Sequence, residues 1–290
     1  MHFYVSERKM RFCSLFIAIF LFIPSLLQSE SAFFAIPSGP VYRHIGLSSP
    51  KIRSVFLRFG DRLEIENEYV HGSISWFLCS KDELQFYLPE VYVVKETKGI
   101  EFDVDGNIPI GKEVIDRWNS LPLHYRPSDL VPILQEYKAS GYEKRELLLR
   151  SEAAEVFSRV IEDAQSDGVN LRILSAFRDA RYQSALYGSA IRRLGVLQVG
   201  VAKPGCSEHQ LGTTCDLTTD EIDGRLSVDF ERTAAFQWLQ DHMYLYSLSM
   251  TYPKLKGKAM GYMYEPWHYR YWGQERWKQI KSTYGLFLSR

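Results

Sequence analysis

Two short segments of this sequence carry residue types that bind and use a metal ion. The first segment, residues 204–217, contains His209 and Asp216. The second segment, residues 265–271, contains His268. Two imidazoles and one carboxylate form a typical ligand set for a catalytic zinc ion, which keeps a fourth position for water. The sequence therefore predicts one zinc ion, bound by His209, Asp216 and His268.

The second segment also carries a carboxylate that has a different expected role. Glu265 precedes His268 by three residues, with Pro266 between them. We expect Glu265 to lie beside the ion without binding it and to take a proton from water. A fixed cation would stabilise the charge that develops on the substrate oxygen, and Arg178 is the candidate for this role. Together these groups suit the hydrolysis of an unreactive amide bond.

The spacing within the first segment predicts how its side chains are presented. His209 and Asp216 are seven residues apart, with Gly212 between them, which favours a loop that enters a strand at residues 214–217. Successive side chains of a strand point to opposite faces. If Asp216 faces the metal, Cys215 therefore faces away from it.

Three motifs occur in a fixed order along the chain: Ser-x-Phe-Arg at 175–178, Ser-x-His-x-x-Gly-x-x-x-Asp at 207–216, and Glu-x-Trp-His at 265–268. In this order they resemble the VanY-type zinc D-alanyl-D-alanine carboxypeptidases of peptidase family M15. The resemblance covers roughly residues 121–272, and Thr214 stands where the family usually has alanine. It implies the hedgehog/DD-peptidase fold, which these enzymes share with the dipeptidase VanX and the zinc-binding domain of hedgehog.

The resemblance also implies a role for each matched residue. Zinc would be held by His209, Asp216 and His268, with Glu265 as the general base and Arg178 as the group that steadies the substrate and the oxyanion. The expected substrate is the D-Ala-D-Ala terminus, or a related terminus, of peptidoglycan stem peptides. The residues expected to contact that substrate are Ser207 and Gln183, at its terminal carboxylate, and Trp267, in the pocket wall.

Other interpretations stay open at this stage. Cys206-x-x-His209 with Cys215 has spacing that suits a structural zinc site, although it would leave Asp216 and Glu265 without roles. The two cysteines could instead form a disulfide or remain as buried thiols. On the same scaffold the chain could be an L,D-carboxypeptidase, an endopeptidase, or a catalytically silent zinc-containing module that binds the cell wall.

The elements expected around these motifs mix helices and strands without a βαβ repeat, which predicts an α+β fold with an antiparallel sheet and flanking helices. A strand-rich N-terminal accessory segment, residues 32–120, would precede a zinc peptidase domain, residues 121–290. Hydrophobic periodicity and turn residues predict helices at 151–168, 180–194 and 230–242, and strands at 52–58, 84–88, 91–94, 169–175 and 214–217.

The N-terminus has the layout of a secretory signal peptide. Arg8, Lys9 and Arg11 precede an apolar run at 12–27, and small residues lie just before Ala32. The run is shorter than the ~20 residues of a membrane span. Residues 1–31 are therefore expected to be a signal peptide, with export to the periplasm or cell envelope and no stable membrane span after cleavage.

The overall charge argues against one class of partner. The chain has 35 Lys and Arg residues and 35 Asp and Glu residues, so its formal net charge is zero. A polyanion-binding protein usually carries an excess of positive charge. Nucleic acid is therefore not an expected partner.

Overall fold

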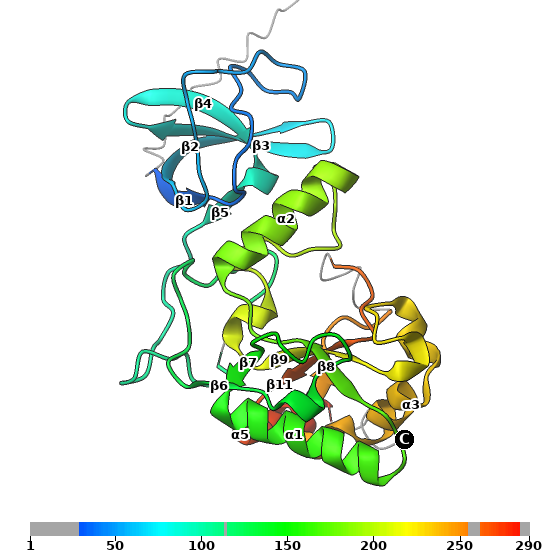
Figure 1. The fold of residues 1–290 in the computed structure, drawn as a ribbon. Coiled ribbons are helices and arrows are strands. Elements are labelled where there is room, and N and C mark those ends of the chain that lie inside the picture. The colour runs from blue at the N-terminus through cyan, green and yellow to red at the C-terminus, as the bar shows by residue number, and fades with distance from the viewer. Residues whose placement is uncertain (1–28, 113–114, 255–261, 285–290) are drawn as a thin grey trace, which may run out of the picture.

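The computed structural model describes residues 29–112, 115–254 and 262–284, and the expected signal peptide lies almost entirely outside them. The fold is α+β, with antiparallel strand pairs forming a five-stranded, a four-stranded and a two-stranded sheet among the described residues. The five-stranded sheet forms an N-terminal unit, and the other two sheets belong to a second unit with most of the helices (Figure 1).

The N-terminal unit is a curled sheet with the strand order β4-β3-β2-β1-β5. Its core contains Trp76, Phe34 and Phe86, which are almost completely buried. A 3₁₀ helix, Glu90–Tyr92, separates the last two strands. The strands are β1 (Glu30–Phe34), β2 (Arg62–His71), β3 (Ile74–Lys81), β4 (Leu84–Pro89) and β5 (Val93–Lys95). Since β1 begins at Glu30, the expected cleavage point before Ala32 lies within this strand.

The second unit is built on a sheet with the strand order β10-β11-β9-β8. These strands are β8 (Arg172–Ser175), β9 (Thr214–Thr218), β10 (Leu248–Met250) and β11 (His268–Tyr271). A two-stranded sheet of β6 (Leu130–Pro132) and β7 (Leu148–Arg150) lies next to the first helix of this unit. This four-stranded sheet, which carries metal-binding candidates, is therefore assembled from segments that lie far apart in the sequence.

Helix α1 (Ser151–Ser166) supplies much of the second core. Its buried residues recur at helical spacing, so that one face packs on the sheet. Two further helices, α3 (Ala234–His242) and α5 (Gln274–Tyr284), complete this unit. The buried residues of α1 are Ala153, Phe157, Val160, Ile161 and Ala164.

Helix α2 (Ala180–Leu194) lies between the two units (Figure 1). The Asp179 side chain caps its first turn by accepting a hydrogen bond from the backbone N–H of Tyr182 (2.7 Å). The helix ends at Gly195, which has a positive φ of 86°. One face of α2 packs on the N-terminal core through Tyr187 and Ile191.

The contact between α2 and the N-terminal unit is close and polar as well as apolar. A Cβ added to Gly188 would lie 2.8 Å from Cδ of Pro37, so this approach requires glycine. The Ser184 hydroxyl donates to the carbonyl oxygen of Ala35 (2.9 Å). Lys203, which is nearly buried, forms an ion pair with Glu90 and donates to the carbonyl oxygen of Val93 (3.2 Å). The two units therefore form one packed structure.

Several expected elements are confirmed by the structure. Helix α2 has the predicted bounds, α1 ends two residues before its predicted end, and strands β4, β8 and β9 fall within or close to their predicted ranges. No helix among the described residues is long and apolar enough to cross a bilayer.

Three expected elements differ from the structure. Of the strand expected at 91–94, Val91 and Tyr92 lie in the 3₁₀ helix Glu90–Tyr92, and β5 begins only at Val93. Residues 52–58 form no strand, because this segment has no partner beyond an isolated bridge at its edge, between Lys51 and Tyr42. The helix expected at 230–242 is divided into a 3₁₀ helix (Val228–Arg232) and α3. Thr233 lies between them in an extended conformation and caps α3, accepting from the backbone N–H of Phe236 (3.1 Å). A capping side chain thus starts a new helix where periodicity alone suggested a continuous one.

Candidate metal centre

The pairing of β9 and β11 brings two of the expected ligands together. In this antiparallel pair His268 lies directly opposite Asp216, and Tyr269 lies opposite Cys215. Directly opposed residues present their side chains to the same face within contact distance. Tyr269 and Cys215 face the hydrophobic core of the second unit, so Cys215 does point away from Asp216.

A short 3₁₀ helix, Glu208–Leu211, brings His209 to the same place. It ends at Gly212, whose φ of +73° is left-handed and favours glycine. Nδ1 of His209 donates to the carbonyl oxygen of Ala176 (2.7 Å), which leaves Nε2 pointing at Oδ1 of Asp216 (3.2 Å). The turn at Gly212 therefore allows a helix and a strand to aim two side chains at one point.

The three side chains form a compact, buried cluster. Their ligand atoms all lie within 4.8 Å of one another, and no more than 3% of any of the three residues is exposed. Oδ1 of Asp216 is 3.2 Å from Nε2 of His209 and 3.3 Å from Nδ1 of His268. A buried set of two imidazoles and one carboxylate fits a catalytic zinc ion, so the residues present suit the metal that the sequence suggests.

The charges around the cluster also favour a cation. Burial lowers the pKa of His209 to about 4, so this imidazole is neutral and able to bind a metal. Burial also acts to lower the pKa of His268, but Asp216 and Glu208 outweigh it and raise that pKa to about 10. Despite its burial, the pKa of Asp216 lies well below its ordinary value. His268 is thus a cation beside the ionised carboxylate of Asp216, and a metal ion bound there would displace one of its protons.

Glu265 lies beside the cluster but outside it. Its Oε2 is 3.5 Å from Nδ1 of His268, and 18% of its side chain is exposed. The backbone N–H of His268 donates to the carbonyl oxygen of Glu265 (3.2 Å), which fixes the turn between them. Burial raises the pKa of Glu265 to about 7. A carboxylate with such a pKa is able to accept a proton and return it near neutral pH.

Arg178 lies next to Asp216. Its Nη1 is 3.6 Å from Oδ2 of Asp216, and its side chain is 20% exposed. The backbone N–H of Arg178 donates to the carbonyl oxygen of His209 (3.2 Å), which ties the end of the β8 segment to the 3₁₀ helix. The guanidinium is therefore held next to the cluster with part of its surface open to a substrate.

The remaining residues expected at the site line the same cavity of about 380 Å³. Ser207 and Gln183 are buried in its wall. In its present orientation, the side-chain amide of Gln183 donates from Nε2 to the carbonyl oxygen of Ala202 (2.8 Å). Its Oε1 has no partner among the described residues. Oε1 is thus able to accept from a substrate N–H group, a contact that differs from the one with the terminal carboxylate that the sequence predicts for Gln183. Trp267 packs against the core and lines the cavity from the strand side.

Sequence reasoning missed Glu208. This residue is 3% exposed, and its carboxylate accepts from Nε2 of His268 (2.9 Å) and from Nη1 of Arg270 (2.9 Å). Burial acts to raise the pKa of Glu208, but Arg270 and His268 outweigh it and lower the pKa to about 2. The sequence offered one signal: an acidic residue directly before a predicted ligand, in a segment otherwise poor in charge.

The cysteines take no part in the cluster. Among the described residues Cys79, Cys206 and Cys215 carry free thiols, and all three are buried. The tyrosine hydroxyl of Tyr262 donates to the backbone carbonyl of Cys206 (3.2 Å), not to its thiol. The structure therefore contradicts both the disulfide and the cysteine-rich zinc site, and the cysteines are buried thiols.

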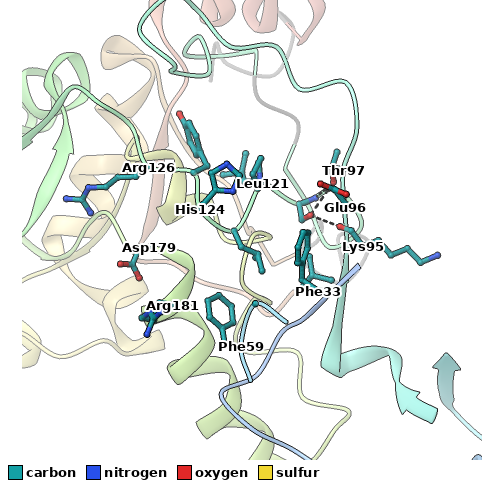
Figure 2. Close-up of a pocket in the computed structure, with 16 residues that line it drawn as sticks. Phe33, Phe59, Lys95, Glu96, Thr97, Leu121, His124, Arg126, Asp179 and Arg181 are labelled. Carbon is teal, nitrogen blue, oxygen red and sulfur yellow. Dashed lines mark hydrogen bonds between the residues drawn. The ribbon is translucent and has the colours of Figure 1, made fainter. Parts of the chain in front are cut away.

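A larger cavity, of about 550 Å³, lies between the two units. Phe33 and Phe59 from the N-terminal unit face Leu121, His124 and the start of α2 across it (Figure 2). None of the three cluster residues lines this cavity. The metal-binding candidates therefore belong to the smaller cavity.

Comparison with known proteins identifies the family of this chain. Residues 146–274 match the family model described as VanY, D-alanyl-D-alanine carboxypeptidase. Over 165 residues, the chain is 30% identical to VanXYC of Enterococcus gallinarum, a bifunctional D-Ala-D-Ala dipeptidase and carboxypeptidase, and the match covers 56% of this chain and 83% of that protein.

Two further relatives extend the comparison. The chain is 33% identical to YodJ of Bacillus subtilis (strain 168), named as a carboxypeptidase, over 59% of this chain but only 63% of YodJ. The match therefore spans less than two thirds of that relative. Among solved structures, the LdcB LD-carboxypeptidase is similar with a TM-score of 0.54 and 30% identity, covering 66% of this chain and 88% of that one.

Proposed function

This chain belongs to the VanY family of D-alanyl-D-alanine carboxypeptidases, and we propose that it is a zinc-dependent carboxypeptidase acting on peptidoglycan stem peptides. The substrate bond would be the terminal D-Ala-D-Ala bond or a related one. The observation that carries this proposal is the buried cluster of His209, Asp216 and His268 with a carboxylate beside it, Glu265, whose Oε2 is 3.5 Å from His268.

In this proposal the zinc ion would be held by His209, Asp216 and His268. Zinc supplies a Lewis acid, which polarises a carbonyl group and acidifies water at neutral pH. Glu265 accepts the proton of the attacking water and then delivers it to the leaving amine. Its position and its pKa of about 7 suit both transfers.

Arg178 and the cavity wall act on the substrate itself. The Arg178 guanidinium stabilises the negative charge that develops on the carbonyl oxygen during attack. Ser207 would help to hold the terminal carboxylate, and the unpaired Oε1 of Gln183 would accept from a substrate N–H group. Trp267 would exclude water from one side of the bound peptide.

A second candidate function differs in the bond that is cut. One similar solved structure is that of the LdcB LD-carboxypeptidase, a protein that recognises peptidoglycan. The same ligands and base would serve an L,D-carboxypeptidase, since the chemistry at the carbonyl group is unchanged. An endopeptidase and a silent wall-binding module are further alternatives, and the intact pair of Glu265 and Arg178 argues against the silent module.

The place of action would be outside the cytoplasm. Peptidoglycan lies there, and the basic residues and apolar run at the N-terminus have the layout of an export signal. We therefore propose export to the periplasm or cell envelope.

One experiment separates these functions. The zinc-loaded protein is incubated with purified muropeptides, and the products are identified by mass spectrometry, with Glu265→Gln as the matched control. Loss of one D-Ala from stems ending in D-Ala-D-Ala supports the main proposal. Loss of a terminal D-Ala that is bonded to an L-amino acid supports the second candidate, the L,D-carboxypeptidase. Cleaved crosslinks indicate an endopeptidase. No zinc-dependent product from any muropeptide would overturn both carboxypeptidase proposals.

A further inference from the structure

The two histidines of the cluster use different ring nitrogens. Nε2 of His209 points to Asp216, whereas His268 points to the same oxygen of Asp216 with Nδ1. A neutral imidazole carries one N–H, so only the other nitrogen has a lone pair for a metal. Each histidine therefore needs a partner that holds its proton on the correct nitrogen.

For His209 this partner is a backbone carbonyl. The Ala176 oxygen accepts from Nδ1 at 2.7 Å, and a carbonyl oxygen is able only to accept. The backbone that follows β8 thus keeps Nε2 of His209 unprotonated for the metal.

For His268 the partner is Glu208. Its Oε2 lies 2.9 Å from Nε2 of His268, and its Oε1 lies 2.9 Å from Nη1 of Arg270. A carboxylate that is ionised beside a guanidinium only accepts hydrogen bonds. Glu208 therefore requires the His268 proton to be on Nε2, which leaves Nδ1 for the metal.

Two elements of the fold bring this trio together. His268 and Arg270 are two residues apart on β11, so both side chains lie on the same face of the strand. Glu208 enters from the 3₁₀ helix that also carries His209. Arg270 is 2% exposed and stacks on the ring of Trp272, with its guanidinium carbon 3.9 Å from the ring centre. A buried carboxylate is stable only with such a partner.

We infer that Glu208, held in place by Arg270, is a positioning residue that fixes His268 with its proton on Nε2 and its Nδ1 presented to the zinc ion. Glu208 touches neither the substrate nor the metal in this arrangement. This inference rests on the proposed zinc site, but not on the reaction that the site catalyses. Outer partners of metal-bound histidines typically change metal affinity 10–100-fold when they are replaced.

The test measures zinc binding rather than turnover. Zinc affinity is determined by competition with a chromophoric chelator for the wild type, Glu208→Gln, Glu208→Ala and Arg270→Lys. We expect about 10–100-fold weaker binding when the Glu208 charge is removed and a smaller loss for Arg270→Lys, which keeps a positive charge. Glu275→Gln, which removes an exposed carboxylate on α5, is the control and should bind zinc as the wild type does.

A second measurement needs no variant. In ¹⁵N-labelled, zinc-loaded wild type, the nuclear magnetic resonance signals of His268 should show a proton on Nε2 that exchanges slowly with water. Coordination through Nε2, or unchanged zinc affinity in folded Glu208→Gln, would overturn the inference. A protein that binds zinc through Nδ1 of His268 but cleaves no muropeptide would leave the inference in place and overturn the proposed function.

Discussion

At the residue scale, Glu265 and the ligand set differ in how firmly they are held. The ligands are buried and hydrogen-bonded to one another, whereas Glu265 is partly exposed at the mouth of the cluster. Burial raises its pKa to about 7, and the charge on His268 opposes that rise. Glu265 therefore has the environment of a proton carrier.

Replacing Glu265 should separate zinc binding from catalysis. Glu265→Gln is expected to bind zinc normally and to lose turnover by a factor of about 10²–10⁴, because a positioned base contributes about that much. Steady-state kinetics on a peptide ending in D-Ala-D-Ala, with metal analysis of the same sample, checks this. Wild-type turnover in the variant would exclude Glu265 as the base.

The buried thiols give a second prediction at this scale. Burial raises the pKa of Cys206 to about 12, so below that pH the thiol is protonated and a poor nucleophile. A thiol reagent at pH 8 should react slowly with the folded protein and rapidly after unfolding without a reductant. If Cys206 and Cys215 stayed unreactive in the unfolded protein, a disulfide would join them and the structural assignment would be wrong.

At the element scale, the site depends on one turn between the 3₁₀ helix and β9. Gly212 has a φ of +73°, and a Cβ there would lie 3.0 Å from both Cγ of Arg150 and Cδ2 of Leu130. The β9–β11 register then places His268 opposite Asp216. The glycine of the motif therefore serves both backbone conformation and packing.

Gly212→Ala should destabilise the protein by about 1–3 kcal/mol, because a non-glycine residue in this conformation is strained and the added methyl group is crowded. Gly168→Ala is the matched control, since Gly168 has a φ of +77° and open space around it. Urea unfolding should show a smaller loss for Gly168→Ala. Equal losses would mean that the contacts with Arg150 and Leu130 contribute nothing.

At the scale of the whole molecule, α2 links the N-terminal unit to the metal centre. Tyr187 and Ile191 pack into the N-terminal core, while Gln183 and Leu186 line the cavity of the site. A change in how the N-terminal unit docks would therefore act on the wall of the cavity.

Gly188→Val tests this docking. The new side chain would overlap Pro37, and overpacking of this kind costs about 1–3 kcal/mol. Ala185→Val places the same side chain on an exposed position of the same helix and should have little effect. Thermal unfolding of both variants checks the prediction, which fails if the two are equally stable.

Zinc should also stabilise the folded chain as a whole. A ligand present at 100 times its dissociation constant adds about 2.7 kcal/mol to the free energy of unfolding. A chelator should lower the melting temperature of the wild type and abolish turnover, and added zinc should restore both. His268→Ala should show no such shift, and a shift equal to that of the wild type would remove His268 from the ligand set.

Local pattern in the sequence was enough to predict the helices α1 and α2, the strand β9, the family resemblance and the residue types of a zinc site. These features depend on neighbours in the chain: helical spacing in Ala153 to Ala164, the cap at Asp179, and alternation in Cys215 and Asp216. The prediction of a strand at 52–58 was wrong because a strand also needs a neighbouring strand to pair with, and a single segment of sequence does not reveal one.

Tertiary structure decided what depends on distant segments. The opposition of His268 and Asp216 is a matter of sheet register across 52 residues, and the choice of ring nitrogen depends on Ala176 and Glu208. The docking of α2 on the N-terminal unit likewise joins residues far apart in the chain. The order of the metal-binding residues along the chain indicates which chemistry is available. Hydrogen bonds and packing between remote segments determine which atoms of these residues carry it out.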